Sequence, residues 1–176
     1  MLRGATVEML AGGCTGCHGP QGRSQAPSIP SIAGLPETYI INTLQAFQYG
    51  GRYNSIMGRF ALGYAATEIR QLAGYFSQQS FVPLRQAVDW QKVHQGRRLH
   101  RLYCRACHGD PQTAGKKAAS ALNGQWMDYL RWTLQDYLVG INQGDMEMAQ
   151  QLTKMLRRHG QGGLEALVHY YGSARP

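Results

Sequence analysis

The stretch Cys14-Thr15-Gly16-Cys17-His18-Gly19 recurs as Cys104-Arg105-Ala106-Cys107-His108-Gly109, at an offset of 90 residues. One constant offset that continues downstream without a gap indicates that a single structural unit was duplicated. We therefore predict two domains, at residues 1–80 and 90–176, and a linker at residues 81–89. The downstream pairs are Gly34 with Gly124, Tyr39 with Tyr129, Thr43 with Thr133, Leu44 with Leu134, Gln45 with Gln135, Phe47 with Tyr137 and Gly50 with Gly140.

Apolar residues recur at helical spacing in both halves of the chain, and the sequence has no alternating pattern of useful length for a strand. Helices are expected at each Cys-x-x-Cys pair, after the loop that follows it, and near the end of each half. The predicted fold class is therefore all-α. The residues that carry the pattern are Tyr39, Ile40, Leu44 and Phe47 with Leu130, Leu134 and Tyr137, and Ile69, Leu72, Ala73 and Phe76 with Leu164, Leu167, Val168 and Tyr171.

All four cysteines lie in the two Cys-x-x-Cys pairs, and a histidine directly follows each pair. In a c-type site two thiols bond to the porphyrin and the adjacent histidine ligates iron, so this pattern predicts heme attachment. A zinc site is disfavoured because its Cys pairs usually lie about 15 to 20 residues apart, whereas 86 residues separate Cys17 from Cys104. A thioredoxin-like pair would need a strand–helix unit beside it. We predict two covalently bound hemes c: heme 1 at Cys14, Cys17 and His18, and heme 2 at Cys104, Cys107 and His108.

A methionine thioether is the expected sixth iron ligand in a small electron carrier. Met57 is the candidate for heme 1, because no other methionine lies between Met9 and the second heme motif. For heme 2 the offset falls on Glu147, which has a methionine on either side. Met148 is favoured because it begins a helical stripe of apolar residues, and Met146 is the alternative.

The other methionines and histidines have less specific expectations. The ring of an axial histidine is normally held by a carbonyl group, and the loop after His18 offers Pro27 and Pro30 for this role, with Pro111 as a weaker equivalent after His108. Met127 and Met155 are expected in the core. Surface or helix-end positions are expected for His94, His100, His159 and His169.

Heme attachment takes place outside the cytoplasm, so we expect a periplasmic protein whose signal peptide has been removed. The sequence has no run of about 18 apolar residues, which argues against a membrane span. The net charge of +8 falls mostly in the second half, where 13 basic and 7 acidic residues follow residue 83. Its basic clusters either steer an acidic redox partner or form solvated helix faces, and they accompany no nucleic-acid-binding motif. The clusters are Arg97, Arg98, Arg101 and Arg105, and then Arg157 and Arg158.

A family resemblance extends over essentially the whole chain. It is carried by Glu8-Met9-Leu10, the first heme motif, Pro30-Ser31-Ile32-Ala33, Ile56-Met57-Gly58-Arg59, Gly63-Tyr64, Leu72-Ala73-Gly74-Tyr75-Phe76, Gly124-Gln125-Trp126, Tyr129-Leu130, and Met148-Ala149 through Leu152. These segments resemble the diheme cytochrome c subunit of flavocytochrome c sulfide dehydrogenase, which is related to tandem class I diheme carriers. The resemblance implies two tandem class I cytochrome c domains.

The resemblance also implies a non-catalytic electron-transfer subunit. It would form a heterodimer with an FAD-containing flavoprotein that oxidises sulfide, accept electrons singly, and pass them to a soluble acceptor such as a small cytochrome c. FAD is then expected only on the partner subunit. The alternative is a stand-alone periplasmic diheme carrier that delivers electrons to a terminal oxidase. A catalytic diheme enzyme such as a peroxidase is disfavoured, because each half offers a methionine to close the iron.

The uneven charge suggests a direction for electron transfer. Because the excess positive charge lies in the second half of the chain, we expect that half to face an acidic soluble acceptor. The first half would then face the flavoprotein.

Overall fold

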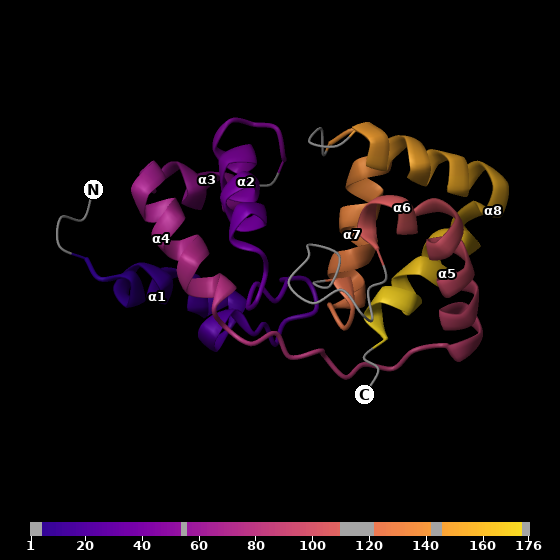
Figure 1. The fold of residues 1–176 in the computed structure, drawn as a ribbon, viewed down its shortest axis with the longest axis horizontal. Coiled ribbons are helices and arrows are strands. Elements are labelled where there is room, and N and C mark those ends of the chain that lie inside the picture. Colours follow the sequence, from indigo (N-terminus) through magenta and orange to yellow (C-terminus); the bar gives the residue numbers. More distant parts are fainter. Residues whose placement is uncertain (1–4, 54–55, 110–121, 142–145, 174–176) are drawn as a thin grey trace. The chain divides into compact units, whose positions relative to one another are not determined.

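The computed structural model describes residues 5–53, 56–109, 122–141 and 146–173. These ranges contain α-helices and one short 3₁₀ helix, and no strand (Figure 1). The chain divides into two compact units, of which the first ends at Phe81 and the second begins at Val82.

The first unit contains α1 (Val7–His18), the 3₁₀ helix η1 (Pro20–Gly22), α2 (Glu37–Gln48), α3 (Met57–Leu62) and α4 (Ala66–Ser77). Helix α1 begins where the Thr6 side chain accepts a hydrogen bond from the Met9 amide, at 3.4 Å. Helix α4 begins where the Glu68 carboxylate accepts one from the Ala65 amide, at 2.7 Å. Side-chain acceptors at a helix start satisfy amides that have no partner within the helix. The buried apolar side chains of this unit include Leu10, Ala11, Ile40, Ile69, Leu72, Ala73 and Phe76.

The second unit contains α5 (Trp90–Tyr103), α6 (Arg105–His108), α7 (Met127–Leu138) and α8 (Met146–Gly172). Asp89 caps α5 by accepting from the amides of Gln91 at 2.9 Å and Lys92 at 3.2 Å. Helix α8 is kinked at Gly160, which has φ 61° and ψ −166°. The core of the unit contains Val93, Leu99, Leu130, Leu134, Leu152, Met155, Leu164, Ala166, Leu167, Val168, Tyr170 and Tyr171.

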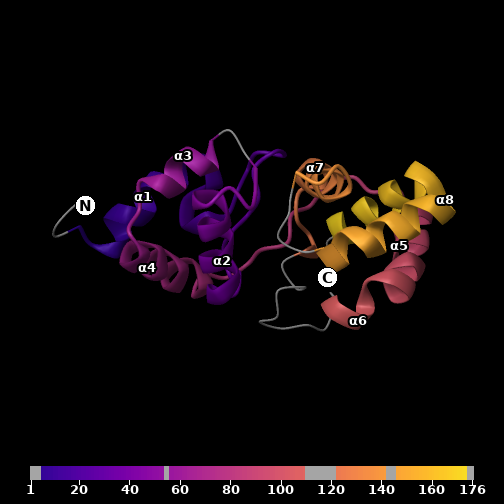
Figure 2. The same ribbon diagram turned by 90° about the horizontal axis from the view of Figure 1, so that it is seen from above.

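A close crossing joins α5 to the part of α8 that follows the kink (Figure 2). A β-carbon on Gly96 would overlap the carbonyl oxygen of Ala166 and lie 2.6 Å from the β-carbon of Tyr170. Only glycine therefore allows this approach. The crossing brings the helix that leads into the second heme motif against the helix that carries the candidate methionines.

Residues 82–89 form no helix and belong to the second unit. The Leu84 amide donates to the carbonyl oxygen of Gly124 at 2.8 Å. The Gln86 side chain donates to the carbonyl oxygens of Gln125 at 2.7 Å and Gly172 at 3.1 Å. This extended segment is therefore fastened to the unit that it precedes.

Candidate heme sites

The first site lies at the end of α1, where one helical turn carries Cys14, Cys17 and His18. His18 is 8% exposed, and its Nδ1 lies 2.8 Å from the carbonyl oxygen of Pro30. Because a carbonyl can only accept, Nδ1 is the donor, and Nε2 of the neutral ring keeps the lone pair that a metal needs. Burial lowers the pKa of His18, and the bond to Pro30 partly opposes this effect. The expected loop carbonyl is thus that of Pro30.

Tyr64 lies against the first cysteine of this site. Burial raises the pKa of the Cys14 thiol, while a hydrogen bond with Tyr64 acts in the opposite direction. Burial also raises the pKa of Tyr64, and the neighbouring Cys14 adds to it. The free thiol in this structure is the group that would become a thioether, so Tyr64 would lie beside the porphyrin attachment point.

Met57 is the first residue of α3, and its side chain is half-buried. The Gln48 side chain at the end of α2 donates to the carbonyl oxygens of Ala61 at 2.7 Å and Tyr64 at 2.9 Å. These bonds hold the segment that begins with Met57 against α2. The role of Met57 as the sixth ligand of heme 1 stays a prediction.

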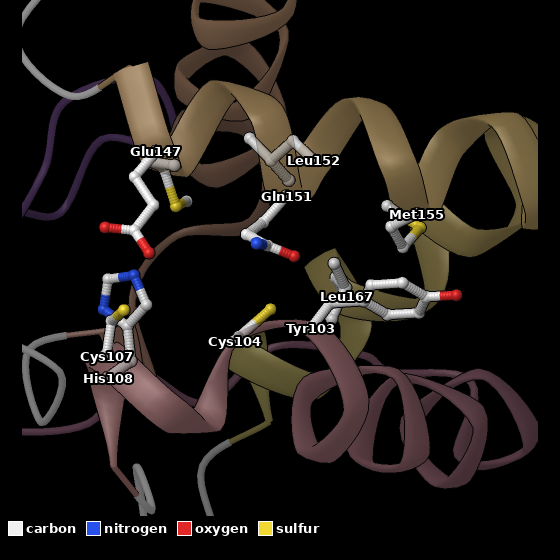
Figure 3. Close-up of a pocket in the computed structure, with 10 residues that line it drawn as sticks. Tyr103, Cys104, Cys107, His108, Glu147, Gln151, Leu152, Met155 and Leu167 are labelled. Carbon is white, nitrogen blue, oxygen red and sulfur yellow. The ribbon is translucent and has the colours of Figure 1, made fainter.

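The second site forms a pocket between the heme motif and the start of α8 (Figure 3). Its empty volume is about 440 Å³, a figure that includes space open to solvent. Figure 3 shows the carboxylate of Glu147 and the ring of His108 pointing toward one another across it. The lining residues are Tyr103, Cys104, Cys107, His108, Glu147, Met148, Gln151, Leu152, Met155 and Leu167.

The donor groups of this pocket fit an iron porphyrin. Two thiols, an imidazole and the Met148 thioether line one cavity together with apolar side chains such as Leu152 and Leu167. Met148 is half-buried, whereas Met146 is 75% exposed. Burial and position therefore favour Met148 over Met146 as the sixth ligand of heme 2, which remains a prediction.

Met127 and Met155 are expected in the hydrophobic core, and their positions agree with this. Met155 is fully buried. Met127 packs against the core of the second unit.

His100 corrects an expectation, because it lies in the core and not at the surface. Its side chain is 2% exposed, with Nδ1 at 2.8 Å from the Tyr171 hydroxyl and Nε2 at 2.8 Å from the carbonyl oxygen of Gly109. Tyr171 in turn is hydrogen-bonded to Cys104, whose thiol pKa is raised chiefly by burial. Sequence reasoning missed this network. One feature of the sequence could have indicated that His100 is buried: the offset of 90 pairs it with the apolar Leu10.

Of the other histidines, one is exposed and two are hydrogen-bonded within the second unit. His94 is exposed. His159 lies 3.2 Å from the Tyr103 hydroxyl, and His169 accepts from the Asp89 amide at 3.1 Å at the start of α5. Pro111, the weaker candidate for a carbonyl partner of His108, lies outside the described residues.

Within the described ranges, none of the helices is both long and apolar enough to cross a membrane.

Comparisons with known proteins found relatives over most of the chain. Cytochrome c4 of Thiocapsa roseopersicina is 32% identical over 144 residues, which cover 76% of this chain and 73% of that protein. The cytochrome subunit of sulfide dehydrogenase of Chlorobaculum tepidum is 44% identical over 73 residues, which cover 42% of this chain and 66% of that protein. The crystal structure of reduced cytochrome c4 from Pseudomonas stutzeri matches with a TM-score of 0.76 at 25% identity, covering 96% of this chain and 98% of that one. No protein-family model matches the chain.

Proposed function

Because this chain belongs to the cytochrome c4-like diheme cytochromes c, we propose that it works as a periplasmic carrier that accepts electrons at one unit and passes them to a soluble acceptor from the other. The predicted all-α fold of two tandem class I domains is confirmed by the match to cytochrome c4. The finer assignment, to a subunit of a sulfide dehydrogenase, rests on a likeness over less than half of the chain.

The pocket of the second unit is the observation that carries this proposal. Heme c supplies an iron that takes up and releases one electron at a time. Cys104 and Cys107 would bond to the porphyrin, and His108 and Met148, which line the same pocket, would ligate the iron. In the first unit, Cys14 and Cys17 would hold the porphyrin, with His18 and Met57 as ligands.

The protein's own residues would keep the iron closed to substrates. His18 is held in a ligating orientation by the carbonyl oxygen of Pro30. A methionine that occupies the sixth position leaves no open site for catalysis, which suits a carrier. We therefore assign no catalytic residue to the chain.

A basic surface on the second unit supports docking of an acidic acceptor. Arg98 and Arg101 are exposed on α5, and Arg105 is exposed on α6. Arg98 and Arg101 are three residues apart and share a helix face. The exposed Cys107 follows two residues after Arg105. Positive charge beside an attachment cysteine would raise the rate of encounter with an acidic partner.

The second candidate function is that of the electron-accepting subunit of an FAD-containing sulfide dehydrogenase. The 44% identity to the cytochrome subunit of sulfide dehydrogenase favours it. In that complex the first unit would face the flavoprotein, and FAD would be bound only by the partner. Two one-electron hemes match the two electrons that a reduced flavin delivers.

Purification of the native protein separates the two candidates. Mass spectrometry should show a chain with two porphyrins added, and a chain with fewer would refute both functions. A carrier should elute without flavin absorbance. Stoichiometric elution with a flavin-containing chain would refute the stand-alone carrier and support the sulfide dehydrogenase subunit.

A further inference from the structure

The second unit buries an imidazole where the first unit buries an aliphatic side chain. His100 is 2% exposed, and its counterpart in the repeat, Leu10, is 5% exposed. Each residue lies four positions before the first cysteine of its heme motif. A buried polar ring costs free energy unless its nitrogens are hydrogen-bonded. The partners of His100 therefore decide what it does.

The two partners fix the hydrogen positions of the network. The carbonyl oxygen of Gly109, 2.8 Å from Nε2, can only accept, so Nε2 carries the proton. In the neutral ring, Nδ1 then accepts from the Tyr171 hydroxyl at 2.8 Å. Burial raises the pKa of Tyr171 well above its ordinary value, so the phenol keeps this hydrogen.

This arrangement orients the Tyr171 hydroxyl relative to the second heme motif. When its hydrogen is donated to His100, the hydroxyl oxygen has only lone pairs to offer the neighbouring Cys104. Once Cys104 is a thioether, its sulfur has no hydrogen to donate. The negative end of the hydroxyl dipole would then lie beside the point where heme 2 is attached. A negative dipole near the iron favours the ferric state over the ferrous state.

In the first unit, the carbonyl group after the heme-motif histidine is hydrogen-bonded without the help of another histidine. Gly19 directly follows His18, and its carbonyl oxygen accepts from the Gly22 amide at 3.0 Å. In the second unit the equivalent carbonyl, that of Gly109, accepts from His100. Leu10 cannot make such a bond. The tyrosine beside Cys14, Tyr64, is only half-buried, in contrast to Tyr171, which is 3% exposed.

We propose that His100 and Tyr171 are positioning residues of heme 2, which hold the carbonyl after the axial histidine and lower the reduction potential of heme 2. The inference rests on the proposed function, because it requires heme at the second motif.

Spectroelectrochemical titration of the diheme protein tests the proposal. In His100→Leu the Tyr171 hydroxyl loses its acceptor and turns its hydrogen toward Cys104, so the midpoint potential of heme 2 should rise. A tenfold change in the ratio of ferrous to ferric iron, about 59 mV for one electron, is the expected order. Tyr171→Phe should also raise the potential, and the double variant should show less than the sum of the two shifts, because the residues act as one unit.

Two further variants separate positioning from a merely structural role. His100→Gln keeps a donor and an acceptor, and should return the midpoint toward that of the original protein. His94→Leu removes an exposed imidazole from the same helix, and should leave both midpoints unchanged. The midpoint of heme 1 should stay the same in every variant.

The outcomes distinguish this inference from the function on which it rests. An original protein with fewer than two hemes refutes the proposed function and the inference with it. Two attached hemes with an unchanged heme 2 midpoint in His100→Leu overturn the inference alone, even if the variant is less stable. If His100→Leu does not take up heme 2, Tyr171→Phe decides: a raised midpoint supports the proposal, and an unchanged one overturns it.

Discussion

Gly96→Ala should destabilise the second unit at the crossing of α5 and α8. The added β-carbon would overlap the carbonyl oxygen of Ala166 and crowd Tyr170, and a backbone atom cannot turn aside as a side chain can. Overpacking of this kind costs up to about 3 kcal/mol. Alanine gains about 1 kcal/mol over glycine in a helix interior, so the net loss is about 2 kcal/mol. At about 4–8 °C per kcal/mol for a domain of this size, the melting temperature of the unit should fall by about 8–16 °C.

Scanning calorimetry of the two-heme protein measures this change. Gly162→Ala is the matched control, because it lies in the same unit and its β-carbon would meet nothing within 4 Å. That variant should be more stable by up to about 1 kcal/mol, from helix propensity alone. A Gly96→Ala protein as stable as the original would refute the close crossing. The pocket would then lack the packing that brings its two walls together.

Three further predictions concern the methionines near the pocket, the ion pair between Arg131 and Glu165, and the basic surface. Met148→Leu should abolish the spectrum of methionine-ligated iron in one of the two hemes, whereas Met146→Leu should leave both spectra intact; visible and magnetic circular dichroism spectra decide. A hydrogen bond from Arg131 holds the pKa of Glu165 below its ordinary value. The ionised Glu165 therefore stabilises the fold above its unfolded-state pKa, and this contribution is lost as the pH falls through its folded-state pKa. Because the Arg131–Glu165 pair is partly exposed, Glu165→Gln should lower the free energy of unfolding by only about 0.2–1 kcal/mol at neutral pH. In urea unfolding measured at several pH values, the variant should lose less stability on acidification than the original protein, and an equal loss would contradict a stabilising role for the pair. Replacing Arg98 and Arg101 by Gln should slow electron transfer to an acidic acceptor and weaken the dependence of the rate on salt. Stopped-flow rates equal to those of the original protein would refute docking of the acceptor at this basic surface.

The predicted sixth ligand of heme 2 shows where sequence reasoning ends. The repeat places Glu147 opposite Met57 and leaves Met146 and Met148 as near equals. Helical spacing favours Met148 because it begins an apolar stripe, but spacing alone does not show which side of that helix faces the second heme motif. The structure separates them by burial, since Met148 lines the pocket and Met146 is 75% exposed.

The sequence by itself predicted the covalent chemistry of this protein and determined its architecture. A Cys-x-x-Cys-His motif places two thiols and an imidazole within one helical turn, so its chemistry is local and can be read from spacing. The duplication and the helical periodicity can also be read from spacing along the chain, and they predicted the tandem all-α fold. The sequence also placed the carbonyl partner of His18 in the loop that follows it, because Pro30 lies only twelve residues further along the chain.

Only the tertiary structure decided what surrounds the second heme motif. His100 and Tyr171 are 71 residues apart in the chain, and they meet because Gly96 lets α5 approach α8 closely. Apart from the apolar Leu10 at the equivalent position of the first repeat, nothing in the sequence indicates whether His100 is exposed or buried. That depends on which distant helix covers it, and the packing of α8 over α5 is what turns His100 from a surface residue into part of the core.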